Sequence, residues 1–436
     1  MTGQQTFLAR GALGVLAGVA SIVACSLPSL RRLSSQGFDR LVTLAFPLSR
    51  FSLFGALFFL LRIAPRGDVP AYYWPEARFV LQGRLPYRDF PSSYAPLHPY
   101  LDAAVITLWH SPLAIIFLSI LIETALIPLW LRFGRTLFSE ATIRTAALLY
   151  LCSTVSLQFV ATDGQDTVII GVFLALAMLL LARSKELLSG LVVGISVATV
   201  KFLPLLYAPT FFLALKKRWH WTLGILLPIV AVYGSFVAMH LNVLVPLQRE
   251  GGIKSAGNFP YLVESLFGIS LPARLWDLLL LAVLAAIFLL VARAAHTASP
   301  ETRLRVIVFA MPALTLALMI FSKKSWPPYL MLTLFPLCLL IDGRRLLQVA
   351  AFAGVGIVAV LEHSYWATFL SQLDAQHLHQ GLLSGQSTYF ILFAFELFLL
   401  AGYGWLLALS LRNISSSERL APRTPSSQGE LAPNFQ

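Results

Sequence analysis

The segment between Arg66 and Phe90 contains the side chains of this sequence that are best suited to chemistry. Within it, Asp68 follows Gly67 directly after a long apolar run, so its carboxylate is expected just beyond the end of an apolar helix. A carboxylate in that position could act as a general base that deprotonates a hydroxyl nucleophile. The alternative is a solvated acid beside Arg66, because isolated acids are common on protein surfaces.

Tyr94 and His98 close the same loop and offer further hydrogen-bonding groups. Pro96 and Pro99 lie in the same segment. Their restricted backbone favours an extended conformation just before the next helix. The two polar side chains could contact a substrate, or they could serve only the architecture of the loop. No other His or Cys lies at a spacing suited to a metal ligand, so His98 is not expected to bind metal.

The sequence Asp163-Gly-Gln165-Asp166 predicts a tight turn between two apolar helices. Asp163 and Asp166 could cap the helix that follows, since Asp is favoured at helix N-termini. Alternatively, Gln165 or Asp166 points into a cavity and binds hydroxyl groups of a substrate.

Lys201 lies between two apolar runs, and Pro204 breaks the helix just after it. A charge at membrane depth costs about 2.5–3.5 kcal/mol on insertion scales, so it usually faces a partner or a cavity. Lys201 is therefore a candidate for holding a phosphate near the lipid headgroups. A lysine that snorkels to the interface is the alternative.

A second basic turn follows a later apolar run and carries four candidate binding residues: Lys323, Lys324, Ser325 and Trp326. Its two ammonium groups could hold a lipid phosphate, or they could attract anionic headgroups without specificity. Residues 250–268 form a glycine-containing loop that could close over a substrate.

The composition is that of a membrane protein. Of the 436 residues, 58% are hydrophobic and 12% are charged, whereas soluble domains carry about 25% charged residues. Repeated apolar runs approaching ~20 residues predict helices that span a bilayer. The net charge of +12 resides in short basic loops, a pattern that sets membrane orientation and argues against nucleic-acid binding. The three Cys all lie in apolar runs, and no metal site or other cofactor is predicted.

We predict an all-α, multi-pass transmembrane helical bundle with roughly 11–13 membrane segments, several of them short or broken. Residues 1–40 are expected to form an uncleaved extra helix and a cytoplasmic linker, residues 41–411 the main transmembrane domain, and residues 412–436 a disordered cytoplasmic tail. An interfacial helix is expected near Trp74–Gln82, ended by Gly83. The predicted spans are residues 8–27, 41–63, 111–133, 141–161, 166–182, 187–200, 203–215, 220–240, 276–295, 306–321, 329–341, 345–361 and 389–411.

Assigning the basic loops to the cytoplasm gives a consistent orientation from residue 28 onward. The opposite, non-cytoplasmic face of the cell (inner) membrane then receives every polar segment described above. These segments are residues 64–100, Asp163–Asp166, the turn around Lys201, residues 241–275, Ser322–Pro328 and residues 362–388.

Taken together, these motifs resemble glycosyltransferase family 87, the polyprenyl-phosphate-mannose-dependent mannosyltransferases of the GT-C membrane superfamily. The resemblance covers about residues 41–411, and it rests on the order and shared sidedness of short motifs. The matching stretches are Gly67-Asp68-Val through Tyr72, Ala77 through Gly83, Pro86-Tyr87, Tyr94-Ala-Pro-Leu, Asp163-Gly-Gln165, Val200-Lys-Phe-Leu-Pro204, Asn258 through Gly268, and Ser325-Trp326. The first loop and the Lys201–Pro204 turn are also similar to the catalytic mannosyltransferase of glycosylphosphatidylinositol synthesis.

The resemblance implies a GT-C fold and transfer of a monosaccharide, mannose by default, from a polyprenyl-phosphate-linked sugar donor. The acceptor would be a lipid or glycan reached from the non-cytoplasmic face among the membrane lipids, with inversion at the anomeric carbon. By this analogy Asp68 is the catalytic base and Lys201 helps to position the donor phosphate. The other candidate binding residues are Tyr94, His98, Gln165, Asp166, Lys323, Lys324, Ser325 and Trp326.

Two positions depart from the family pattern. Related sequences tend to have Trp-x-His-Tyr after the serine, whereas this chain has Pro328 at the histidine position. In the glycosylphosphatidylinositol relatives the first-loop acid belongs to an Asp-x-Asp motif, and Pro70 stands at the position of the second acid here.

Two other functions remain open. One is a lipid-linked glycan flippase or other transporter, which would use ionisable residues inside the bundle such as Arg50, Glu123 and Glu396. The other is a glycan polymerase or ligase.

Overall fold

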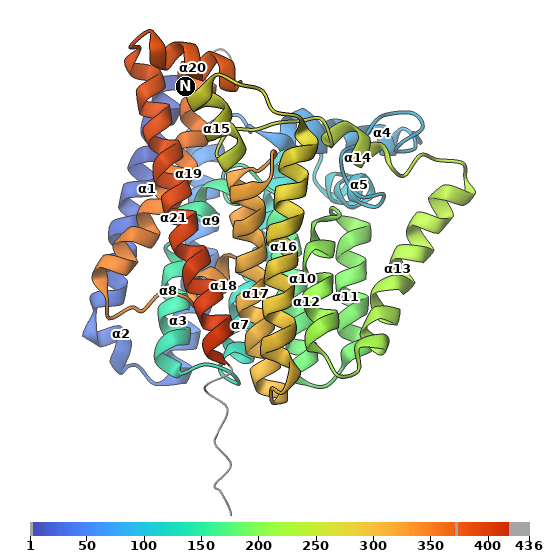
Figure 1. Cartoon of the computed structure of the whole chain (residues 1–436), viewed down its shortest axis with the longest axis vertical. Coiled ribbons are helices and arrows are strands. Elements are labelled where there is room, and N and C mark those ends of the chain that lie inside the picture. The colour runs from blue at the N-terminus through green and yellow to red at the C-terminus, as the bar shows by residue number, and fades with distance from the viewer. Residues whose placement is uncertain (1–2, 371–373, 418–436) are drawn as a thin grey trace, which may run out of the picture.

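A computed structural model describes residues 3–370 and 374–417, which form helices and no strand. The protein is an all-α, multi-pass helical bundle (Figure 1). Eight helical segments in the described residues are long and apolar enough to cross a membrane. They are α1 (Gly3–Ser26), α3 (Ser35–Gly55) with its continuation η1 (Ala56–Leu60), α6 (Leu113–Thr124) with α7 (Leu126–Gly134), α13 (Arg218–Ala238), α16 (Ala273–His296), α17 (Pro300–Phe321), α19 (Leu346–Phe369) and α21 (Ser387–Ser417).

The remaining predicted spans are shorter or interrupted helices, as the sequence indicated. Breaks fall where a proline or a Ser cap interrupts the apolar run, because neither continues a helix well. These elements are α8 (Glu140–Leu151) followed by α9 (Thr154–Phe159), α10 (Thr167–Ala182), α11 (Glu186–Thr199), η3 (Leu203–Tyr207) with α12 (Ala208–Ala214), and η4 (Pro327–Leu332) with α18 (Leu334–Cys338).

Short helices gather at one end of the bundle, called here the upper end (Figure 1). They are η2 (Val69–Tyr73), α4 (Trp74–Leu81), α5 (His98–Leu108), α14 (Val245–Glu250), α15 (Phe259–Phe267) and α20 (Ala375–Leu383). Helix α4 is the predicted interfacial helix, and Gly83 follows it with a positive φ of 77°. At the opposite, lower end, α2 (Pro28–Arg32) connects α1 to α3.

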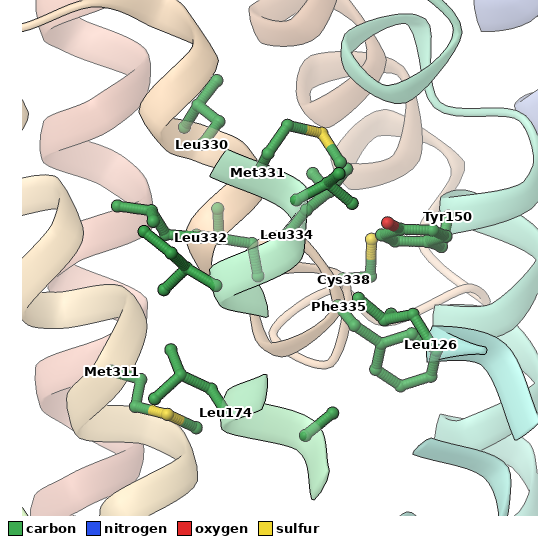
Figure 2. Packing of buried hydrophobic residues seen from close by; sticks show 14 of the residues in the cluster. Leu126, Tyr150, Leu174, Met311, Leu330, Met331, Leu332, Leu334, Phe335 and Cys338 are labelled. Carbon is green, nitrogen blue, oxygen red and sulfur yellow. The ribbon is translucent and has the colours of Figure 1, made fainter. Parts of the chain in front are cut away.

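The centre of the bundle is an interrupted chain segment, η4 and α18, packed between long helices. Figure 2 shows Leu330, Met331, Leu334 and Phe335 of this segment among side chains of α10, α17 and neighbouring helices. Non-helical backbone at membrane depth is tolerated only where protein surrounds it. Thr167 accordingly donates a hydrogen bond to the Pro328 carbonyl at 3.1 Å.

Helices α11 and α13 approach closely through glycines. A Cβ at Gly190 would lie 2.1 Å from the Trp221 carbonyl oxygen, and one at Gly194 would lie 2.3 Å from the Ile225 carbonyl oxygen. This is the small-xxx-small pattern by which membrane helices bring their backbones together. This close packing fixes the position of α11 against α13, and α11 leads directly into the Lys201 turn.

Both ends of the chain add to the bundle. The predicted extra helix is α1, which packs against α19. At the other end, the prediction of disorder from residue 412 is wrong for residues 412–417, because α21 continues to Ser417. The Asn413 side chain donates to the Leu409 carbonyl oxygen at 2.9 Å and supports this last turn. Residues 418–436 of the predicted tail lie outside the described residues.

A fully buried ion pair, Arg50 with Glu123, joins α3 to α6 at 3.9 Å. The Arg50 guanidinium also donates to the carbonyl oxygens of Tyr150 and Leu151, where α8 ends, and to the Ser156 hydroxyl. The last carbonyls of a helix have no partner within it. Arg50 therefore satisfies the interrupted backbone between α8 and α9.

Replacing Arg50 by Met should destabilise the protein by about 3–5 kcal/mol, because it leaves the Glu123 charge unpaired and removes the side-chain donor of the Leu151 carbonyl. The measurement is thermal unfolding of the purified protein in detergent. The double variant Arg50→Met/Glu123→Gln removes the uncompensated charge and should recover part of the loss. A single variant that melts with the wild type would contradict this role.

Candidate functional site

Two distant chain segments are joined by backbone hydrogen bonds at the upper end. The Ala95 N–H donates to the Val200 carbonyl at 3.0 Å, and the Leu97 N–H donates to the Ala198 carbonyl at 3.1 Å. These carbonyls are free to accept because α11 ends at Thr199. The pairing brings the Tyr94–His98 loop against the Lys201 turn.

A chain of alternating charges runs through this junction. The Lys201 ammonium lies 2.9 Å from one carboxylate oxygen of Asp166. The Nε2 atom of His98 lies 3.4 Å from the other, and Nδ1 of His98 lies 3.3 Å from Asp102. The His98, Asp102 and Asp166 side chains are almost completely buried, whereas the Lys201 side chain keeps 19% of its surface exposed. This row of charges thus runs from the buried Asp102 to the partly exposed ammonium group of Lys201.

The protonation of these groups follows from their neighbours. Burial alone would raise the pKa of Asp166, but Lys201 and His98 together lower it to about 2. Burial opposes the charge on His98, yet Asp102 and Asp166 outweigh it and raise the His98 pKa. Burial raises the pKa of Asp102 to about 7. Asp166 is therefore a permanent anion. It stands at the N-cap position of α10, but its side chain makes no capping hydrogen bond there.

Aromatic rings pack around the charged chain. The Tyr94 ring stacks on His98 with centroids 4.5 Å apart, and the Lys201 ammonium lies 4.8 Å from the Tyr94 centroid. Tyr73 contacts both Tyr94 and His98 edge-on or tilted. Cation–π attraction and ring packing therefore fix the directions of Lys201 and His98.

Asp68 lies beside this cluster and is partly exposed. It accepts a hydrogen bond from the Gln165 side-chain amide at 3.1 Å, and the Tyr73 hydroxyl lies at 3.5 Å. Its carboxylate also acts electrostatically on Lys201 and Lys324. The structure thus brings Asp68, Gln165, Asp166 and Lys201 together.

Lys324 is the second cation near Asp68, with 16% of its side chain exposed and an ion pair to Glu250. Burial and the positive charge of Lys201 together lower the pKa of Lys324 to about 8, against the opposing effect of Asp68. Tyr329 belongs to the same electrostatic group, since it acts on Lys201. Lys201 and Lys324 repel each other and both interact with Asp68, so an anion bound near the two ammonium groups would stabilise them.

The other residues of the second basic turn have different partners. Lys323 pairs with Asp277 at 2.7 Å, and the Trp326 ring lies 6.3 Å from His363. Ser325 is buried, and both its backbone N–H and its carbonyl bond the Ser255 hydroxyl. Ser325 therefore connects the loop of residues 250–258 to this turn. No described hydrogen bond or ion pair joins Lys323, Ser325 or Trp326 to Asp68 or Lys201.

Several contributors were not predicted as site residues. Asp102 lies one helical turn after His98, a spacing that could have revealed it. Tyr73 and Tyr329 belong to motifs noted in the sequence, but nothing there distinguished them from packing residues. Asp163 pairs with Arg10 of α1 at 2.5 Å, a contact that no sequence spacing shows.

The largest cavity described, about 740 Å³, lies elsewhere, between α1–α3 and α8, and none of the candidate site residues lines it. Among the described residues, no group of three or more His, Cys, Asp or Glu side chains could hold a metal ion. Comparison with protein-family models and with curated proteins finds no match for this chain.

The buried carboxyl of Glu76 supports the Tyr94 loop. It accepts a hydrogen bond from Ser92 at 2.7 Å, and the Ser92 hydroxyl in turn accepts from the Tyr94 N–H at 3.2 Å. Burial raises the pKa of Glu76 from 4.5 to about 7, although Ser92 and His98 oppose this shift. The folded protein therefore keeps a proton on Glu76 at pH values where the unfolded chain has released it.

Because of this retained proton, the free energy of unfolding decreases as pH rises from about 4.5 to about 7. The total decrease is about 3 kcal/mol. Glu76→Gln keeps the acceptor for Ser92 but cannot ionise. It should melt like the wild type at pH 5 and at a higher temperature than the wild type at pH 8. Melting curves at the two pH values test this, and a difference independent of pH would contradict it.

Proposed function

We propose that this chain is an integral membrane glycosyltransferase that moves a monosaccharide from a polyprenyl-phosphate donor to a lipid or glycan acceptor. The observation that supports it best is the partly exposed Asp68 carboxylate beside two cations, Lys201 and Lys324. The membrane-spanning helices and the resemblance of the sequence motifs to glycosyltransferase family 87 agree with this proposal.

The proposed reaction needs a base and an anion site on opposite sides of one carbon. The acceptor hydroxyl transfers its proton to Asp68 as its oxygen bonds to the anomeric carbon. The bond from that carbon to the phosphate oxygen breaks, and its electron pair leaves with the polyprenyl phosphate. Lys201 and Lys324 stabilise the departing phosphate, and attack opposite the leaving group inverts the anomeric carbon.

The arrangement of donors supports these assignments. Gln165 donates from its side-chain amide to one Asp68 oxygen and so fixes the direction of that carboxylate. An anion bound between the two ammonium groups would relieve the repulsion that lowers the Lys324 pKa. Mannose remains the default sugar from the family resemblance, and the active site is proposed to face the non-cytoplasmic side of the cell (inner) membrane.

The two departures from the family pattern lie at different places in the site. Pro70 belongs to η2, directly after Asp68, so Asp68 is the one acid of the pair that this loop retains. Pro328 contributes a carbonyl that Thr167 bonds, and Tyr329 stands next to it within the electrostatic group of Lys201. We propose that Tyr329 and His98 supply the polar surroundings that a histidine at position 328 would provide.

One observation favours a transporter as the second candidate. Arg50 and Glu123 bond each other and the backbone, which gives them a structural role. Glu396 of α21 differs, because it is fully buried beside another carboxyl group. It interacts with the buried Glu362 of α19. Such a pair within membrane helices could bind and release protons during transport.

Asp68→Asn should reduce sugar transfer by at least ~10²-fold, because the amide cannot accept the acceptor proton. The assay incubates purified protein in proteoliposomes with a panel of polyprenyl-phosphate sugars and detects a new lipid-linked product. Asp89→Asn, which changes an exposed acid of the same loop, is the matched control and should retain activity.

Retained turnover by Asp68→Asn would remove the proposed base. Movement of an intact lipid-linked sugar across the vesicle membrane, without any new glycosidic bond, would favour the transporter. Product size separates a monosaccharide transferase from a glycan polymerase or ligase.

The donor KM should rise above pH 8, by roughly tenfold per charge lost, because Lys324 loses its proton there and binds phosphate less well. Lys324→Arg stays charged and should keep a low donor KM at pH 9. Lys324→Met should raise the donor KM at neutral pH and remove this rise. Measuring KM between pH 7 and 9.5 tests the assignment, and an unchanged pH profile in Lys324→Met would refute it.

A further inference from the structure

His98 is buried between two carboxyl groups, one at each ring nitrogen. Nδ1 lies 3.3 Å from Asp102 and Nε2 lies 3.4 Å from Asp166. A neutral imidazole donates from one nitrogen and accepts at the other, whereas an imidazolium donates from both. Among the described residues, Asp102 and Asp166 lie at ion-pair distances on opposite sides of the ring, and carboxyl groups in these positions suit a positively charged imidazolium.

The groups that face His98 come from five elements. Tyr73 of η2 and the Tyr94 ring cover its faces, and Glu76 of α4 acts on it electrostatically. Asp102 shares α5 with it, Asp166 begins α10, and the repelling charge of Lys201 follows α11. The carboxyl groups of Asp102 and Asp166 are the closest of these to the ring.

We propose that His98 is a permanently protonated positioning residue whose imidazolium shares the charge of Asp166 and so leaves Lys201 able to bind the donor phosphate. This inference rests on the proposed function. It assigns His98 a role behind the substrate site, whereas the sequence left open whether His98 contacts a substrate or serves only the architecture of the loop. With 2% of its surface exposed, His98 has no open face for a substrate.

The argument depends on what Lys201 would experience without the imidazolium. Among the described residues, Lys201 and His98 are the cations that pair with Asp166. If His98 were neutral, the full charge of Asp166 would act on Lys201 alone and cancel most of its attraction for phosphate. An imidazolium at the second oxygen adds a positive charge that offsets part of the Asp166 field, and Asp102 on the far side of the ring offsets the imidazolium less because it lies farther from Lys201. Lys201 then keeps a net positive field on its exposed side.

A competing arrangement places the proton on Asp102 instead. A protonated Asp102 could donate to Nδ1 of a neutral His98, which would still donate from Nε2 to Asp166. The distances are the same in both arrangements, so the location of the proton must be measured. In the competing arrangement His98 carries no charge and the proposal fails.

The first measurement is ¹⁵N magnetic resonance of the full-length protein labelled at histidine, reconstituted in lipid. We expect one histidine, identified by its change in Asp102→Asn, to show two protonated ring nitrogens at pH 7. A neutral ring with hydrogen on Nε2 at pH 7 would overturn the proposal. This readout is independent of any enzymatic activity.

The second measurement is the affinity for a short-chain isoprenyl monophosphate, carried out on Lys324→Arg so that titration of Lys324 does not contribute. Asp102→Asn in this background should move the loss of the imidazolium and the loss of phosphate affinity to lower pH by the same amount. His98→Gln should weaken binding by about 10- to 30-fold at pH 7. The proposal is overturned if the pH dependence of phosphate affinity is the same in Lys324→Arg with and without Asp102→Asn.

The two hypotheses fail separately. If the charge on His98 and the phosphate affinity are lost over the same pH range but no sugar is transferred, His98 is supported as a positioning residue and only the transferase proposal is contradicted. Sugar transfer with a neutral His98 would contradict the positioning role alone.

Discussion

The contact of Asp166 with Lys201 and His98 is the interaction on which the upper end of this protein depends. Asp166 begins α10, Lys201 follows α11 and His98 begins α5, so one buried carboxylate joins three elements. Each charge would be costly alone in a low-dielectric surrounding. Together they form a stable chain because every member has an opposite charge beside it. Asp68 and Gln165 are placed by the same junction, since Gln165 directly precedes Asp166.

The interrupted helices follow a second constraint, that backbone groups inside a membrane need partners within the protein. Arg50 meets this need between α8 and α9 with its guanidinium, and Thr167 meets it at η4 with its hydroxyl. These breaks are useful as well as tolerated. Where α11 stops at Thr199, its last carbonyls accept from the Tyr94 loop, and the interruption becomes the scaffold of the candidate site.

Much of the architecture was predictable because apolar runs report membrane segments directly. The all-α bundle, the short and broken helices and the presence of a helix near Trp74 agree with the structure. Asp68, Gln165, Asp166 and Lys201 were predicted as site residues and lie together. The roles of Asp102 and Arg10 could not be predicted, because pairing across the bundle depends on which helices are neighbours. The same limit explains Lys323 and Trp326, whose partners Asp277 and His363 come from other helices.

The contact between Arg10 and Asp163 links the first helix to the candidate site. Asp163 is buried two residues before Gln165, in the turn that positions Asp68. Arg10 also donates to Ser364 of α19, so the helix is held on two sides. Proteolytic removal of α1 would leave the Asp163 carboxylate buried without its counter-ion, and the turn would have to open to admit water. Helix α1 is therefore part of the structure that holds the upper end of the bundle together.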